Sequence, residues 1–230
     1  MRIALPWLDP ATLDFPDPAT ALTNPNGLLA AGGDLRPARL LEAYRRGIFP
    51  WYSDDQPILW WSPDPRMVLI PAELHISRSL AKTLRSGRFH VTSDRAFSEV
   101  LEGCAAPRRH SEGTWLDAAM QRAYLELHRL GHAHSLEVWQ GDELAGGLYG
   151  IALDGIFFGE SMFSRASDAS KVALVTLAGA LKTGGYRVID CQVASPHLAS
   201  LGARLMTRKA FMALLPTDTD ISRPAYWPVQ

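Results

Sequence analysis

The segment HSLEVWQGDELAGGLYGIALDGIFFGESMFS, residues 134–164, contains three apolar runs separated by two short pairs of turn-forming residues. The first pair is Gly141-Asp142 and the second is Asp154-Gly155. Because such a pair between two apolar runs is a strong signal for a β-hairpin, each one predicts a tight turn. We therefore predict an antiparallel meander with strands at residues 134–140, 143–153 and 156–164.

The residues on either side of this meander predict helices and further strands. Residues 170–185 are apolar almost all round, which is typical of a buried helix, and residues 187–193 are typical of a strand. Helical patterns cover residues 76–87, 93–105 (opened by Ser93 or Asp94), 116–131, 196–202 and 208–215, and a strand pattern covers residues 88–92. This order predicts an α+β fold with a mixed, largely antiparallel sheet, and it suits the GNAT-like (acyl-CoA N-acyltransferase) architecture.

The first 65 residues differ from the rest because they are rich in proline, tryptophan and glycine. One helix is predicted here, over residues 36–47, with Asp34 as its N-cap, Pro37 in its first turn and Gly47 as its stop. The prolines oppose regular sheet. We therefore predict a small irregular N-terminal domain, residues 1–65, followed by the GNAT-like domain, residues 66–230.

Composition limits the class of protein. The chain has 230 residues, 47% of them apolar, and a formal net charge of −1, so any polyanion is held by a local basic patch. Cys104 and Cys191 are the only cysteines and match no metal spacing, which favours a reducing compartment. Without a signal-peptide pattern or a membrane-span pattern, the expected location is cytoplasmic.

Two strands carry polar residues that call for an explanation. In VIDCQV, residues 188–193, strict alternation places Asp190 and Gln192 on one face. In residues 156–164, the same alternation places Glu160 with Phe158 and Met162, where a carboxylate is costly unless it is paired or faces a cleft. The structural alternatives are a half-exposed strand or a buried turn for the first pair, and an outward-facing edge residue for Glu160.

Aromatic and basic residues suggest a nucleic-acid surface. Trp51 and Trp115 lie in loops, where they suit stacking on an unpaired base, although core packing is the common role of tryptophan. Arg78, Lys82 and Arg85 follow helical spacing on one face, and Arg88 comes just after them. This face either binds the phosphates of a nucleic acid or is simply a solvated surface.

Metal and cofactor motifs are absent from the sequence. His132 and His134 have no accompanying third ligand, and no P-loop or G-x-G-x-x-G motif follows a strand. The pyrophosphate loop that acetyl-CoA enzymes carry at the start of the buried helix is replaced by SRASDASK. We therefore expect no metal and no cofactor, and an acetyl-CoA enzyme is disfavoured.

The chain resembles the leucyl/phenylalanyl-tRNA–protein transferase family over about residues 15 to 210. The resemblance rests on segments in the family's order, among them NPNGLLAAGGDL, LLEAYRRGIFPWYS, PILWWSPDPR, LHISRSL, GTW, LHRLGHAHSLEVW, GESMFSR, ASKVAL, IDCQV and LASLGA. It implies that leucyl-tRNA and phenylalanyl-tRNA donate their amino acid to proteins with N-terminal arginine or lysine. The product carries a destabilising N-terminal residue. A monomer without metal or cofactor is expected.

The resemblance also implies roles for individual residues. Asp190 and Gln192 fall at the reaction centre, where the neutral amide suits positioning better than proton removal. Glu160 receives the α-ammonium of the aminoacyl group. The side-chain pocket falls on Leu148, Phe157, Met162 and Leu177, and the aromatic contacts near the terminal adenosine of tRNA fall on Trp51 and Trp115. The basic face of Arg78, Lys82, Arg85 and Arg88 is our own candidate for contacts with the acceptor-stem phosphates. Leu177 stands where a well-known member of the family has a phenylalanine, so the preference between leucine and phenylalanine stays open.

Other functions are compatible with the same groove. A transferase of the same fold, acting on a cell-wall precursor or a small amine, would differ only in its acceptor. A catalytically silent tRNA-binding module would keep the tryptophans and the basic face but tolerate Gln192→Ala. An acetyl-CoA enzyme would be stabilised by CoA.

Overall fold

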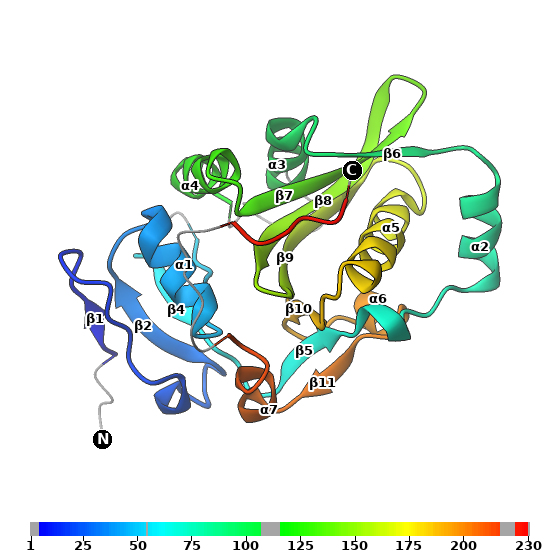
Figure 1. Cartoon of the computed structure of the whole chain (residues 1–230). Helices are drawn as coiled ribbons and strands as arrows, with labels where there is room; N and C mark the ends of the chain where they lie inside the picture. The colour runs from blue at the N-terminus through cyan, green and yellow to red at the C-terminus, as the bar shows by residue number, and fades with distance from the viewer. Residues whose placement is uncertain (1–4, 54, 107–115, 217–223, 230) are drawn as a thin grey trace.

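The computed structural model describes residues 5–53, 55–106, 116–216 and 224–229, which contain two β-sheets (Figure 1). The larger sheet has seven strands in the order β11-β5-β10-β9-β8-β7-β6. They are β5 (Arg66–Leu69), β6 (His90–Ser93), β7 (Ala133–Gln140), β8 (Glu143–Leu153), β9 (Ile156–Ser164), β10 (Val188–Gln192) and β11 (Arg204–Met206). Within these described strands only β9 and β10 run parallel, so the predicted α+β fold with a largely antiparallel sheet is confirmed.

The meander forms as predicted. β7 pairs with β8 and β8 with β9, all antiparallel. In the second turn Asp154 and Gly155 have φ values of 40° and 79°, and two positive φ values match the twist of a two-residue hairpin. β5 pairs with the other edge of β10, and β11 pairs with β5. Neither strand is predicted from the sequence, because each is only three or four residues long.

Helices cover both faces of this sheet (Figure 1). α5 (Ala169–Thr183) and α2 (Arg78–Arg85) share one apolar cluster with the sheet, here called the α5 cluster. α3 (Phe97–Ala105) and α4 (Ala118–Arg129) share a second cluster on the opposite face, the α3/α4 cluster. The all-round apolar helix predicted over residues 170–185 is α5, and its buried residues include Leu174, Leu177 and Leu181.

Two predicted N-terminal capping residues are wrong. α3 begins at Phe97 after Ala96, because Asp94 adopts a positive φ of 56° and its carboxylate accepts the Ser135 N–H instead. α1 (Pro37–Arg45) begins after Arg36. Asp34 accepts the Arg36 N–H, one turn before the helix, and pairs with Arg39. In both places the aspartate stabilises the loop that precedes the helix.

The N-terminal region contains a small sheet of short strands in the order β1-β2-β4-β3. These are β1 (Trp7–Leu8), β2 (Leu28–Gly32), β3 (Phe49–Pro50) and β4 (Leu59–Trp61). Prolines limit the length of these strands rather than preventing the sheet. Short helical turns complete the chain: 3-10 helices at Pro18–Thr20 and Pro71–Glu73, α6 (Pro196–Ala199) and α7 (Arg208–Met212).

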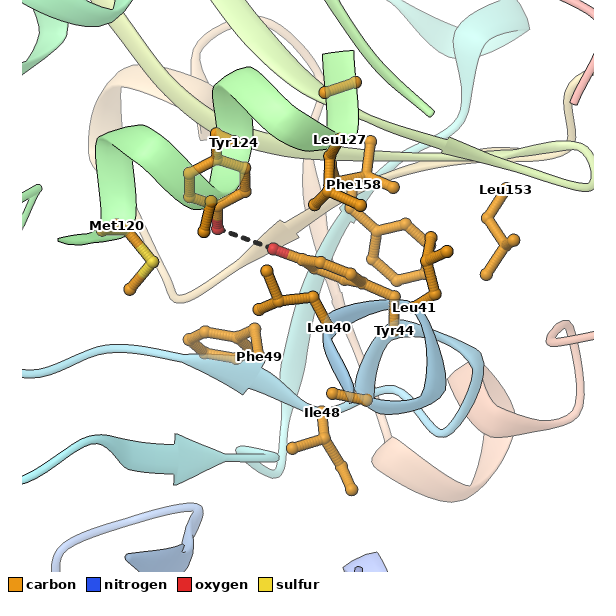
Figure 2. Packing of buried hydrophobic residues seen from close by; sticks show 14 of the residues in the cluster. Leu40, Leu41, Tyr44, Ile48, Phe49, Met120, Tyr124, Leu127, Leu153 and Phe158 are labelled. Atoms are coloured by element: carbon orange, nitrogen blue, oxygen red, sulfur yellow. Dashed lines mark hydrogen bonds between the residues drawn. The ribbon is translucent and has the colours of Figure 1, made fainter. Parts of the chain in front are cut away.

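The α3/α4 cluster continues into the N-terminal region. Leu40, Tyr44 and Phe49 pack against Met120, Tyr124 and Phe158 of the larger part (Figure 2). The Tyr44 and Tyr124 hydroxyls are 2.7 Å apart and hydrogen-bonded inside this core. The division into domains at residues 65 and 66 stays a prediction. In the described part of the chain, no helix has both the length and the apolar character that a membrane crossing requires.

Candidate active site

A cavity of about 450 Å³ lies where β9 and β10 separate. The two strands pair only through Ile156–Phe158 and Val188–Asp190, and the residues beyond those pairs line the cavity. Lining residues come from β9, β10, β8, α5 and the loops beside them: Phe49, Pro50, Trp51, Leu148, Tyr149, Phe157, Gly159, Glu160, Ser161, Met162, Leu174, Leu177, Ile189, Cys191, Gln192, Val193, Ser195, His197 and Leu198. Two parallel strands that part in this way open the centre of the sheet to a ligand.

A β-bulge in β9 decides which side chains face the cavity. Tyr149 pairs with Ser161 and Gly150 with Gly159, so Glu160 is the extra residue. As a result Phe157 and Met162 both join the α5 cluster, whereas Phe158 lies in the α3/α4 cluster. The prediction that Phe158, Glu160 and Met162 share one face is wrong, because the bulge reverses the alternation after Gly159.

The four predicted pocket residues come together at the cavity wall. Leu148 from β8, Phe157 and Met162 from β9, and Leu177 from α5 all line it and are all apolar. They form a surface against which a branched or aromatic side chain can pack, and the thioether of Met162 can adapt to either shape.

Glu160 is an acidic residue that lines this cavity. Its Oε2 accepts a hydrogen bond of 2.7 Å from the Tyr124 hydroxyl. Its Oε1 is buried and has no hydrogen-bond partner in the described part of the chain. Burial raises the pKa of Glu160 from 4.5 to about 7, against the lowering effect of the Tyr124 and Tyr44 hydroxyls. The carboxylate is therefore poised to gain a cationic partner.

Tyr44 and Tyr124 form a hydrogen-bond chain that ends on Glu160. Burial and the nearby carboxylate raise the pKa of both hydroxyls well above 10, so both keep their protons. Since Tyr124 donates its single proton to Glu160, its oxygen accepts from Tyr44 (Figure 2). Neither tyrosine is predicted as a site residue from the sequence, because both occupy ordinary apolar helix positions.

Asp190 and Gln192 do not share a face, contrary to the prediction. Gln192 has a positive φ of 54°, and the pairing of β10 with β5 shifts between Asp190 and Gln192. Gln192 therefore lines the cavity together with Cys191, and Asp190 does not. The Gln192 N–H donates to Asp190 Oδ1 over 3.0 Å, and the Gln192 Nε2 is buried without a described hydrogen-bond partner.

Asp190 forms a fully buried ion pair with Arg66 of β5. The Arg66 Nε and Nη2 atoms lie 2.8 and 2.6 Å from the two carboxylate oxygens. Arg66 Nη1 donates to the Gly47 carbonyl, and the guanidinium lies 4.7 Å from the Phe49 ring and 4.9 Å from the Phe211 ring. This bidentate, enclosed pair fixes the end of β10 from which Gln192 projects. Arg66 is not predicted from the sequence, because its only signal is the need of a buried carboxylate for a cation.

Of the two predicted stacking tryptophans, Trp51 lines the cavity and Trp115 lies outside the described residues. Trp51 is 45% exposed, and its ring centroid lies 5.7 Å from that of Trp61. The Trp61 Nε1 donates to the Trp51 carbonyl, which fixes the backbone at this point. The exposed indole beside the cavity is therefore accessible to a flat ligand group.

The predicted basic face is exposed but separate from the cavity. Arg78, Lys82 and Arg85 of α2 and the following Arg88 are all exposed, and α2 lies at the periphery, beyond α5 (Figure 1). Arg88 donates to the Gln140 side chain over 3.1 Å. Any ligand that contacts both this face and the cavity must be large.

The two histidines of the HAH sequence take part in packing. His134 Nδ1 lies 2.8 Å from the Asp94 carboxylate, and burial lowers the pKa of His132. Within the described ranges, no three His, Cys, Asp or Glu side chains gather as metal ligands.

Comparison with known proteins gives the family. A family model described as Leucyl/phenylalanyl-tRNA protein transferase matches residues 68–216, more than half of the chain. The chain belongs to this transferase family. The model of the family's N-terminal domain matches residues 33–64.

Relatives in the leucyl/phenylalanyl-tRNA protein transferase family match nearly the whole chain. The leucyl/phenylalanyl-tRNA–protein transferase of Stutzerimonas stutzeri (strain A1501) is 58% identical over 97% of this chain and 99% of that protein. The transferase of the same name from Pseudomonas aeruginosa (strain PAO1) is 60% identical over 94% of this chain and 96% of that protein.

Solved structures of other proteins align only weakly with this chain. A GCN5-related N-acetyltransferase from Kribbella flavida gives a TM-score of 0.38 at 9% identity, over 71% of this chain and 58% of that chain. The structure of L-PGS from Bacillus licheniformis gives 0.37 at 14% identity, over 66% of this chain and 55% of that chain. Both scores are low, and the α+β assignment rests instead on the strand order and helices described above.

Proposed function

We propose that the chain transfers leucine or phenylalanine from aminoacyl-tRNA to the α-amine of proteins that begin with arginine or lysine. Membership of the family makes it an aminoacyltransferase. The observation that carries the proposal is the unpartnered Oε1 of Glu160 beside an apolar wall. A leucyl or phenylalanyl group offers the matching features, an α-ammonium and an apolar side chain.

In the proposed reaction the acceptor amine attacks the carbonyl carbon of the aminoacyl ester. A C–N bond forms and the C–O bond to the terminal ribose of tRNA breaks. The amine loses a proton, and the ribose hydroxyl leaves protonated. Glu160 binds the α-ammonium of the donor, and the four pocket residues hold its side chain. Because the ester is already activated, correct placement of the two reactants supplies much of the rate.

Gln192 and Asp190 act at different distances from the reacting atoms in this proposal. The side chain of Gln192 lines the cavity and has a free amide donor for a reacting group. Asp190 accepts the Gln192 N–H and pairs with Arg66, so it holds the backbone that carries the amide. We assign Gln192 to contact with the substrate and Asp190 to positioning.

The remaining site residues are proposed tRNA contacts. We propose that Trp51 and Trp115 stack on the terminal adenosine and that Arg78, Lys82, Arg85 and Arg88 contact backbone phosphates. Aminoacyl-tRNA is made in the cytoplasm, so we place the reaction there. The chain acts as a monomer in this proposal.

The test is transfer of radiolabelled leucine from leucyl-tRNA to a protein with N-terminal arginine. The same protein with an acetylated N-terminus is the matched acceptor control, since it has no α-amine. Gln192→Ala is compared with Gln56→Ala, a change at an exposed loop glutamine that does not line the cavity. We expect transfer to the free amine only, strongly reduced by Gln192→Ala and unaffected by Gln56→Ala.

Each contrary result overturns a separate part of the proposal. Absence of transfer to the free amine would overturn the protein acceptor. Full activity of Gln192→Ala would remove Gln192 from the reaction while leaving the function in place. A third acceptor carries alanine in place of the N-terminal arginine. Equal transfer to this acceptor would overturn the preference for arginine or lysine.

A further inference from the structure

The C-terminal segment, residues 224–229, packs against the α5 cluster through Ala225, Trp227 and Val229 (Figure 1). The segment lies beyond residues 68–216, which the family model matches. None of its residues lines the cavity or enters the reaction described above.

Trp227 is held firmly in place. Its ring stacks on His134 with centroids 4.3 Å apart and planes 9° apart. Its Nε1 donates to the Ser93 hydroxyl over 2.9 Å, and the neighbouring Tyr226 carbonyl accepts from the Tyr186 hydroxyl over 2.6 Å. These contacts fix the indole from the side of β6 and β7.

Trp227 also contacts Phe157, which is one of the residues that line the cavity. Its ring lies 5.6 Å from that of Phe157, with planes 28° apart, and Phe157 lines the cavity. The Phe157 ring also lies close to Gly150: a Cβ atom added to Gly150 would lie 2.6 Å from the Cζ atom of Phe157. Phe157 thus contacts both a strand backbone and the Trp227 indole, and the indole can be removed without changing the strands.

We infer that Trp227 is a positioning residue that sets the size of the side-chain pocket through Phe157. Loss of the indole leaves space on the far side of Phe157, into which the ring can shift. A shift in that direction enlarges the pocket and favours phenylalanine over leucine. This inference rests on the proposed function and assigns part of its amino-acid specificity to the C-terminal segment.

The experiment measures kcat/KM for phenylalanyl-tRNA and for leucyl-tRNA in the wild type and in Trp227→Ala. We expect the phenylalanine-to-leucine ratio to rise by about fivefold or more, since apolar pockets discriminate by about 10-fold or more per methylene. Trp227→Phe keeps an aromatic ring in the stack and should retain a ratio near that of the wild type. Tyr226→Ala is the matched control, because it removes an exposed side chain and keeps the carbonyl that Tyr186 contacts.

A second measurement tests the route through Phe157. If Trp227 acts on the pocket only through that ring, Trp227→Ala should not change the ratio further in a Phe157→Leu background. An unchanged ratio in Trp227→Ala, with a lowered melting temperature, would overturn the inference and leave Trp227 a packing residue. Independent effects of the two changes would overturn the route through Phe157. Failure of the wild type to transfer either amino acid would instead overturn the proposed function.

Discussion

Glu160 and Asp190 are two carboxylates on the neighbouring strands β9 and β10, and their surroundings differ. Asp190 is fully buried and both of its oxygens contact Arg66. Glu160 has one hydroxyl partner, Tyr124, and one oxygen without any described partner. Burial raises the pKa of Glu160 to about 7. A carboxylate that the protein has already neutralised supports structure, whereas one that it leaves without a cation is available for a ligand.

The largest expected effect is on stability, at Asp190. Asp190→Ala leaves the buried Arg66 without its partner, and breaking such a pair costs about 3–5 kcal/mol. Urea denaturation measures this as a lowered unfolding free energy. In the double variant Arg66→Met/Asp190→Asn the uncompensated charge is gone and the amide oxygen can still accept the Gln192 N–H, so most of the loss should be regained. A cost below about 1 kcal/mol for the single change would contradict the structural role of the pair.

Glu160 should show the opposite pattern, with loss of activity and no loss of stability. Glu160→Gln keeps the shape but cannot pair with an α-ammonium, and a charge-assisted hydrogen bond contributes about 1.5–3 kcal/mol. We expect kcat/KM for leucine transfer to fall by roughly 100-fold at neutral pH. The exposed Glu143 on the β7–β8 hairpin provides the control, Glu143→Gln. Undiminished transfer by Glu160→Gln would sink the ammonium-binding role.

Sequence patterns predicted the frame of the fold but not which side chains face the cavity. The meander and α5 follow from local turns and apolar patterns, which need no knowledge of distant residues. The faces of Glu160 and Gln192 depend on bulges against β8 and β5. A bulge is set by the pairing with another strand, so period-two alternation fails at both positions.

Arg66 shows the same limit on prediction from sequence. It stands in a proline-rich stretch, 124 residues from Asp190 along the chain. No spacing rule connects positions so far apart. The resemblance to a family placed Asp190 and Gln192 at one centre, but the geometry assigns the cavity contact to Gln192 and the ion pair to Asp190.

A pH titration of stability sharpens the contrast between the carboxylates. The pKa of Glu160 rises from 4.5 to about 7 on folding, so the folded state binds more protons than the unfolded state between these values. The unfolding free energy should therefore fall as pH rises through this window. We expect a Glu160 contribution of about 2 kcal/mol, less than the full shift implies because the residue is partly exposed. Denaturation of wild type and Glu160→Gln at both ends of the window measures it; equal slopes would contradict the raised pKa.

The smallest expected effect is that of Tyr44→Phe, at the far end of the hydrogen-bond chain. Tyr124 keeps its bond to Glu160 but loses its own donor, which costs about 1 kcal/mol of stability. Because the tyrosine hydroxyls lower the pKa of Glu160, loss of one should raise that pKa further. The ionised carboxylate that binds the donor ammonium then forms only at higher pH. The acidic limb of the pH profile of KM for leucyl-tRNA should accordingly move to higher pH, whereas Tyr226→Phe, an exposed control, should leave it in place. A loss of stability with an unmoved pH profile would restrict Tyr44 to packing. The pKa of Glu160 would then depend on the Tyr124 hydroxyl alone.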